Sequence, residues 1–195
     1  MLRKDLPPLD MYLDHAVSMD RDVFLARHPW PILVIPEPDP KVMAKLIRPD
    51  TMIHHDDETK MLDDLSSAKM SGASLDALVL EVRPRPGSSP RKMTIGRAPE
   101  ADVVLIDETI SRLHAELGWE VEEQRATIID LGGRNGTMVD GMKLPPRGEA
   151  ELVPGAIVIF GALATRYYSP EAFLAWLSTG APRAGAAPMP WPRDR

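Results

Sequence analysis

Apolar and polar residues alternate one by one through the middle of the chain. In the clearest run, residues 114–122, Ala115, Leu117, Trp119 and Val121 fall on one side and polar residues or glycine stand between them. A period of two is typical of a half-buried antiparallel β-strand. Shorter alternating or β-branched runs predict further strands at 78–83, 93–95, 103–105, 126–129, 157–160 and 163–168.

Turn-forming pairs of residues separate these runs. They are Pro86-Gly87, Gly132-Gly133, Asn135-Gly136, Asp140-Gly141 and Pro154-Gly155. Glycine, asparagine and proline favour the backbone conformations that tight turns require. Many short strands at this spacing predict an all-β fold, either a sandwich or a barrel.

The two flanks have a different pattern. Residues 20–28 predict a short helix that Pro29 ends, and residues 32–35 are an apolar run between two prolines. Ser169-Pro170-Glu171 is a favourable helix start. We therefore divide the chain into an extension that is partly ordered and then an acidic linker, a β-domain, a helix, and a disordered tail rich in Pro, Ala and Arg. Their ranges are 1–74, 75–169, 170–178 and 179–195.

Composition excludes several classes of protein. The chain has no cysteine, so disulfides, thiolate metal sites and cysteine nucleophiles are excluded. A net charge of −6 without a long basic run argues against nucleic-acid binding. No stretch approaches the ~20 apolar residues of a membrane span, and no apolar segment follows the basic N-terminus as in a secretory signal. We expect a cytoplasmic protein.

Four short motifs stand in order within the β-domain. They are Gly96-Arg97, Ser111-Arg112-Leu113-His114, Asn135-Gly136-Thr137, and Leu152-Val153-Pro154-Gly155 ahead of an apolar strand. Each is weak alone, but their order and intervals resemble the forkhead-associated (FHA) domain family over about half of the chain. The resemblance implies an FHA-type antiparallel β-sandwich. Here it would carry a short C-terminal helix and a mostly irregular, partly helical N-terminal extension.

The same resemblance implies a site for phosphothreonine peptides. A phosphothreonine dianion calls for a guanidinium fork, a hydroxyl and amide N–H groups on fixed loops. By resemblance, Arg97 and Ser111 would bind the phosphate, Arg112 would touch peptide or phosphate, and Asn135 would bind the peptide backbone. Arg134, at a variant position, would add a second cation or lie along the peptide. Structural support would come from Gly96, His114, Gly136 and Thr137.

Besides Arg134, two further positions depart from the family pattern. Gly133 stands where serine is usual, which removes a hydroxyl near the site. Ala156 stands where aspartate is usual, which removes a turn brace. Because Arg97, Ser111 and Asn135 are all present, we expect a competent pocket.

Structural readings compete with these roles. Outside the motif, Arg97 would simply pair with Asp102 or Glu100. Ser111 and His114 suggest a nucleophile and a base, but no oxyanion loop or third member accompanies them. Residues 54–57, His-His-Asp-Asp, are better explained as a solvated charge run than as a metal site. We expect no enzyme activity, no metal site and no cofactor.

The sequence therefore predicts a non-catalytic phosphothreonine-peptide-binding adaptor in Ser/Thr kinase signalling. Its partner would be a phosphothreonine-containing protein, either a kinase or a kinase substrate, and not nucleic acid. The alternative is a phosphate-independent scaffold or assembly protein that uses the same fold. Thr59, in an acidic stretch, is either a regulatory phosphosite whose phosphorylated form occupies the pocket, or a linker threonine without a role.

Overall fold

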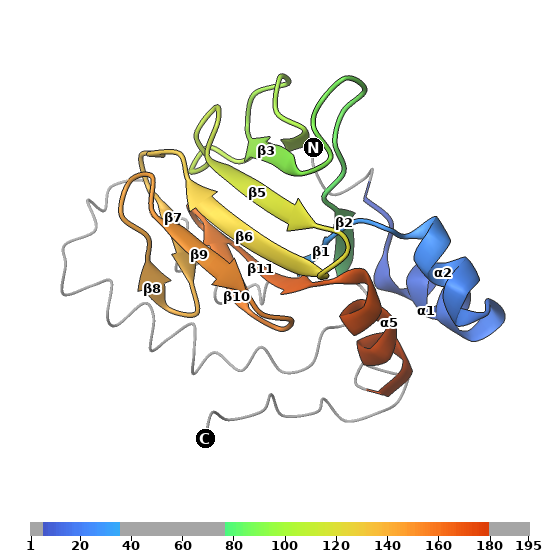
Figure 1. The fold of residues 1–195 in the computed structure, drawn as a ribbon. Helices are drawn as coiled ribbons and strands as arrows, with labels where there is room; N and C mark the ends of the chain where they lie inside the picture. The colour runs from blue at the N-terminus through green and yellow to red at the C-terminus, as the bar shows by residue number, and fades with distance from the viewer. Residues whose placement is uncertain (1–5, 36–76, 180–195) are drawn as a thin grey trace.

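Two β-sheets packed face to face form the body of the structure, a computed structural model that describes residues 6–35 and 77–179 (Figure 1). One sheet has six strands in the order β2-β1-β11-β10-β7-β8, and the other has five in the order β4-β3-β5-β6-β9. All pairings are antiparallel except β3 with β4. The predicted FHA-type sandwich is confirmed. The strands are β1 Ile32–Ile35, β2 Leu78–Glu81, β3 Lys92–Gly96, β4 Val103–Val104, β5 Ala115–Glu120, β6 Arg125–Asp130, β7 Thr137–Val139, β8 Met142–Lys143, β9 Glu149–Leu152, β10 Ile157–Phe160 and β11 Leu163–Tyr168.

The core between the sheets is built from the inward positions of the alternating strands. Trp119, Phe160 and Tyr167 are its largest members, and all three are fully buried. On β5 the buried residues alternate with exposed or half-buried ones, as the period of two predicts. β5 ends at Glu120 because the following residues turn, with Gln124 in the left-handed region at φ 51°.

The apolar run 32–35 forms an interior strand of the six-stranded sheet. β1 pairs with β2 on one side, where Ile32 is opposite Glu81, and with β11 on the other, where Ile32 is opposite Tyr168. Each of its four residues is buried, as the lack of alternation in this run requires. Residues 32–35 and the β-domain that we began at residue 75 therefore share one hydrogen-bonded sheet.

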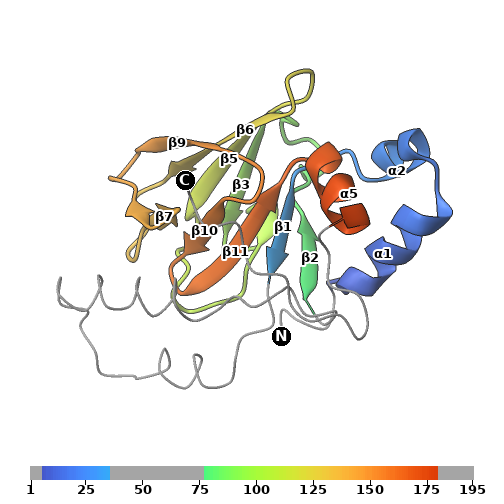
Figure 2. The same cartoon turned by 90° about the horizontal axis from the view of Figure 1, so that it is seen from below.

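Three helices cover the outer face of this sheet over β2, β1 and β11 (Figure 2). They are α1 Leu9–Ser18, α2 Arg21–Arg27 and α5 Pro170–Thr179. The predicted helices over 20–28 and from Pro170 are confirmed as α2 and α5. A second apolar core lies under the helices and is centred on Leu9, Tyr12, Phe24 and Phe173. No helix within 6–35 and 77–179 is long and apolar enough to cross a membrane.

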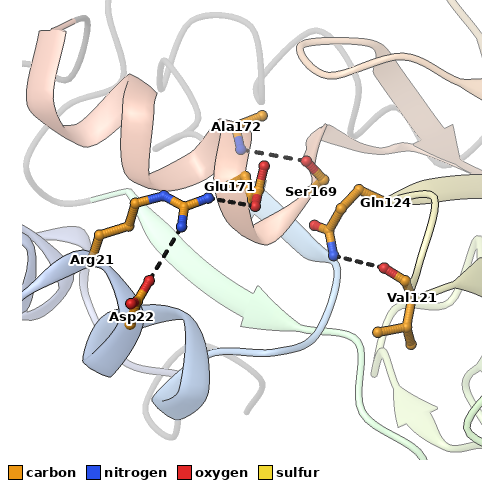
Figure 3. A network of polar contacts seen from close by, with 7 residues as sticks. All are labelled: Arg21, Asp22, Val121, Gln124, Ser169, Glu171 and Ala172. Atoms are coloured by element: carbon orange, nitrogen blue, oxygen red, sulfur yellow. Dashed lines mark hydrogen bonds and ion pairs between the residues drawn. The ribbon is translucent and has the colours of Figure 1, made fainter.

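Polar contacts join α2 to α5 at the surface of this layer (Figure 3). Arg21 Nη2 lies 2.6 Å from Glu171 Oε1, and Arg21 Nη1 lies 3.2 Å from Asp22 Oδ1. At the start of α5, Ser169 Oγ accepts a hydrogen bond from the Ala172 N–H at 3.4 Å, so the serine caps the helix as expected.

A buried carboxylate links the helices to the sheet. The Glu81 side chain on β2 is 3% exposed, and its Oε1 accepts hydrogen bonds from Tyr12 Oη at 3.0 Å and His28 Nδ1 at 2.7 Å. Arg83 donates to Oε2 at 3.0 Å. Burial alone would raise the pKa of Glu81, but the hydrogen bonds from His28 and Tyr12 and the charge of Arg83 outweigh it and lower that pKa. Glu81 is therefore ionised and saturated with donors.

Four sequence predictions lie outside the described residues. They are the acidic linker that ends at residue 74, the charged run at 54–57 within it, Thr59, and the tail 179–195 beyond Thr179. The described ranges hold no group of three or more His, Asp or Glu side chains placed to bind a metal ion.

Candidate functional site

Loops from three of the sequence motifs meet at one end of the sandwich. The Arg97 N–H donates to Ser111 O at 2.9 Å, which joins the end of β3 to the segment before β5. His114 Nε2 lies 3.0 Å from Gly136 O, which joins that segment to the start of β7. The structure therefore brings Arg97, Ser111, His114 and Gly136 together from positions far apart in sequence.

The Arg97 side chain is exposed at this end. Its Nε donates to Ile110 O at 3.2 Å, which fixes the guanidinium over the loop. Among the described residues, no carboxylate lies within ion-pair distance of Arg97 or Arg134. Both guanidinium groups are therefore available to an anionic ligand.

The two acids considered as partners of Arg97 bind elsewhere. Asp102 accepts hydrogen bonds from the Arg85 N–H at 2.9 Å and from the N–H and hydroxyl of Thr94 at 2.8 Å each. Although burial opposes its ionisation, hydrogen bonds from Ser88, Arg85 and Thr94 lower the pKa of Asp102 to about 2. Glu100 forms an ion pair with Arg112 at 3.0 Å.

Arg112 therefore differs from the other two arginines. Its side chain is 74% exposed and that of Glu100 is 60% exposed. Ion pairs at such exposure contribute about 1 kcal/mol or less, so an incoming anion can displace Glu100. The sequence did not predict this pairing.

Ser111 has one hydroxyl hydrogen left to donate. Its Oγ accepts the Arg134 N–H at 3.0 Å, and its own N–H donates to His114 Nδ1 at 3.1 Å. A hydroxyl can donate once while it accepts. The Ser111 hydroxyl can thus donate to an oxyanion while it holds the Arg134 backbone in place.

His114 is fully buried and its tautomer follows from its partners. Because Nδ1 accepts from the Ser111 N–H, the proton of the neutral ring lies on Nε2, which donates to Gly136 O. Burial lowers the pKa of His114, and the contact with Gly136 and the charge of Asp130 offset this only in part. His114 braces two loops as a neutral ring, and its burial keeps it from touching a ligand.

We expect the free energy of unfolding to decrease as pH falls below 6.5, in part through His114. The pKa of His114 is lower in the folded state than in the unfolded state, so on acidification the unfolded state binds the proton first. The contribution of His114 to the free energy of unfolding is therefore complete above pH 6.5 and is lost as the pH falls below that value. Urea unfolding of the wild type and His114→Asn at pH 7.5 and 5.5 would measure this. The variant should lose less stability on acidification, with a maximum difference of about 1.4 kcal/mol per pH unit. Equal losses in both proteins would contradict it.

Asn135 is held by a residue that the sequence analysis missed. Its Nδ2 donates to Thr109 O at 2.7 Å, which leaves Oδ1 to accept a peptide N–H. Thr109 Oγ1 in turn accepts the Ala162 N–H at 2.9 Å, and the Thr109 N–H donates to Asp107 Oδ1 at 2.8 Å. An aspartate side chain that bonds to the backbone two residues on is a turn signature, which could have indicated the turn at Asp107–Thr109 but not its contact with Asn135.

Close approaches, to backbone at Gly96 and to side chains at Gly133, explain two glycines of the site. A Cβ at Gly96 would lie 2.2 Å from Arg112 O, and a Cβ at Gly133 would lie 2.9 Å from His114 Nδ1 and 3.1 Å from Ser111 Oγ. His114 and Ser111 therefore leave no space for a side chain at position 133, where the family usually has serine.

The last two supporting residues shape the start of β7. Gly136 has φ 74°, a conformation that favours glycine. The Thr137 hydroxyl donates to the buried Asp130 Oδ2 at 2.8 Å, and Asp130 Oδ1 accepts the Gly132 N–H at 2.7 Å. These contacts fix both ends of the loop that carries Arg134 and Asn135.

Comparisons with known proteins identify the family. The family model for the FHA domain matches residues 93–161. The oxoglutarate dehydrogenase inhibitor of Corynebacterium glutamicum is 31% identical over 108 residues, which are 53% of this chain and 74% of that protein. The chain belongs to the FHA-domain family.

Two other matches cover a smaller share of this FHA protein than the C. glutamicum relative does. The FHA domain-containing protein PS1 of Arabidopsis thaliana is 32% identical over 76 residues, but the chain spans only 5% of that protein. A solved chain from work on phosphothreonine-dependent FHA domain interactions is 27% identical. It covers 46% of this chain and 81% of its own length, with a TM-score of 0.38. The matched region of the family model contains all nine site residues that the sequence predicted at 96–137.

Proposed function

We propose that the FHA domain of this chain binds phosphothreonine segments of other proteins and acts as an adaptor without catalysis. The observation that carries the proposal is the exposed Arg97 guanidinium, which is fixed by Ile110 O and has no acid partner among the described residues. The Ser111 hydroxyl lies on the loop that Arg97 contacts through its backbone N–H.

The strength of such a site follows from its donors. Each hydrogen bond donated to a charged group such as the phosphate contributes about 1.5–3 kcal/mol net. Two or three of them, from Arg97, Ser111 and Arg134, together with Asn135 on the peptide backbone, suit a micromolar Kd, about −8 kcal/mol. Because the Arg112–Glu100 pair is exposed, the phosphate or another anion of the segment could displace Glu100 and bind Arg112.

The proposed partner is a phosphorylated Ser/Thr kinase or a substrate of one. The C. glutamicum relative is named as an inhibitor of another protein, oxoglutarate dehydrogenase. We propose by analogy that this chain also acts through binding. The chemistry of the site predicts binding of the phosphorylated residue and does not identify the rest of the partner.

Fluorescence titration of the full chain with matched peptides would test the proposal. A library of phosphothreonine peptides should contain members with micromolar Kd, while the same peptides without phosphate, or treated with phosphatase, should not bind measurably. Equal affinity with and without phosphate would indicate the phosphate-independent scaffold instead. No binding by any member would reject the phosphothreonine reader.

We also propose Thr59 as a regulatory phosphosite for this domain. Its segment joins β1 to β2, and β1 runs antiparallel to β11, toward the Gly161-Ala162 turn that contacts Thr109. The segment thus begins on the side of the sheet from which the site can be reached, and a tethered phosphothreonine would have a high effective concentration. Kinase treatment should weaken peptide binding in the wild type and leave Thr59→Ala unchanged. An equal response in both proteins would contradict the role of Thr59.

A further inference from the structure

The strand β10 is apolar on both of its faces. Its residues are Ile157, Val158, Ile159 and Phe160, of which Val158 and Phe160 belong to the core between the sheets. Strands with continuous apolar runs are usually buried on both faces. β1 has the same pattern, and its outward Val34 packs in the second apolar core, under the helices. The pattern of β10 therefore predicts a cover over its outer face as well.

The apolar outer face continues onto both strands next to β10. Ile159 is the ladder partner of Ala164 on β11 and of Met138 on β7, and residues directly opposite each other lie on the same face of a sheet. Ile157 lies on this face too, because it is two residues before Ile159. We name Met138, Ile157, Ile159 and Ala164 the apolar sheet face.

The helices α1, α2 and α5 lie over a different part of the sheet. They cover β2, β1 and β11, away from β10 and β7 (Figure 2). Among the described residues, the apolar core beneath these helices includes none from β10 or β7 and does not include Ala164. Ile159 is nevertheless only 6% exposed, and the other three members of the apolar sheet face are half-buried. This face therefore calls for a cover other than the three described helices.

The chain leaves β1 directly beside the apolar sheet face. Val34 is opposite Arg166 on β11, so the residue after Ile35 is level with Ala164. Residues 36–40 have the sequence Pro-Glu-Pro-Asp-Pro, which favours an extended backbone that advances about 3.1 Å per residue. Five such residues span about 15 Å, which equals the three strand spacings of about 4.8 Å from β1 to β7. Residues after Pro40 can therefore reach β10 and β7.

The sequence that follows has the pattern of an amphipathic helix. Four apolar residues recur at the spacing of one helical face, and three basic residues fall on the opposite face. The apolar residues are Val42, Met43, Leu46 and Ile47, and the basic residues are Lys41, Lys45 and Arg48. Asp39 followed by Pro40 is a favourable helix start, and Pro49 disfavours continuation beyond residue 48. The sequence therefore predicts a helix over 40–48.

We propose that residues 40–48 bind the apolar sheet face as an amphipathic helix, with their four apolar side chains against β10 and β7. A helix is about 10 Å wide, which is the width of two neighbouring strands. The outer side of the six-stranded sheet would then carry helices over β10 and β7 as well as over β2, β1 and β11. β7 begins directly after Asn135 and Gly136, so this helix would lie against the strand that follows the loop of the candidate site. The proposal does not depend on the proposed function.

Hydrogen–deuterium exchange of the full chain tests the proposal. In the wild type, the backbone amides of residues 42–48 should exchange about tenfold or more slowly than those of residues 54–60 in the same linker, because a docked helix protects its amides. Ile47→Ser removes an apolar side chain from the docking side and should abolish this protection. Lys45→Ser introduces the same residue on the opposite side of the predicted helix, so it is the matched control and should keep the protection.

Disulfide cross-linking locates the helix, because the chain has no cysteine of its own. Met43→Cys or Leu46→Cys, each combined with Met138→Cys, is compared with the same change combined with Val153→Cys. Val153 is 59% exposed in the turn after β9, on the other sheet. At least one of the pairs with Met138→Cys should form a disulfide within one chain about tenfold faster than its control pair.

Three results would overturn the proposal. Fast exchange of residues 42–48 in the wild type, or equal exchange in Ile47→Ser and Lys45→Ser, would show that the apolar side chains do not hold a helix in place. Protection without faster cross-linking to Met138→Cys would place the helix on another surface. Disulfides between two chains would assign the apolar sheet face to a second copy of the protein.

Discussion

Replacing Arg97 by alanine should weaken phosphothreonine-peptide binding by about 100-fold or more. Arg97 supplies the guanidinium that no acid in the described chain neutralises, and the loss of one or two charge-assisted hydrogen bonds of about 1.5–3 kcal/mol each corresponds to this factor. The stability of the domain should change little, because the side chain is exposed and its one hydrogen bond within the described residues is to Ile110 O. Titration calorimetry with one phosphopeptide, together with a thermal melt, measures both quantities.

Two further variants separate charge from geometry. Arg97→Lys keeps the charge and removes the planar fork, so we expect an intermediate loss. Arg125→Ala removes an arginine at the start of β6, paired with Glu123 and far from the site, and should bind like the wild type. If Arg97→Ala and Arg125→Ala had the same affinity, the phosphate would not bind at Arg97.

Replacing Glu81 by alanine should lower the free energy of unfolding by about 3–5 kcal/mol. The change leaves Tyr12 Oη and His28 Nδ1 buried without their acceptor, and breaking a buried pair from one side has costs of this size. Loss of the ion pair with Arg83 adds little to this decrease in the free energy of unfolding, because the Arg83 side chain is 61% exposed. Urea denaturation at neutral pH measures the change.

A surface pair in the same helical layer provides the comparison. Glu171→Ala removes the ion pair with Arg21, in which the two side chains are 51% and 62% exposed, and should cost about 1 kcal/mol or less. Similar losses in Glu81→Ala and Glu171→Ala would show that the buried carboxylate does not hold the helices to the sheet.

The sequence predicted strands where burial leaves a pattern and missed those where it does not. β5 is recognisable because its buried residues alternate with exposed or half-buried ones, and β10 and β11 because each contains a run of consecutive buried residues. Both residues of β8 are exposed, and β9 buries only Leu152, so neither has a pattern to detect. α1 was missed because it buries only Leu9 and Tyr12 and begins after two prolines.

In the candidate site, too, some residues could be predicted from the sequence and others could not. Residues of local motifs, such as Arg97, Ser111 and Asn135, could be selected from order and spacing alone. Their braces could not, because the Thr109–Asn135 and Glu100–Arg112 contacts join segments that only the folded chain brings together. The same is true of Gly133, whose missing side chain is explained by His114 and Ser111.

The position of β1 determines which fragments of the chain can be produced separately. A fragment that starts at residue 75, the start of the β-domain in the sequence analysis, would lack β1, the strand between β2 and β11. The sides of β2 and β11 that pair with β1 would then be left without hydrogen-bonding partners, and such unpaired strand edges favour aggregation. A fragment for crystallisation or binding assays should therefore begin ahead of Ile32, and one that also keeps Tyr12 would retain the acceptor contacts of Glu81.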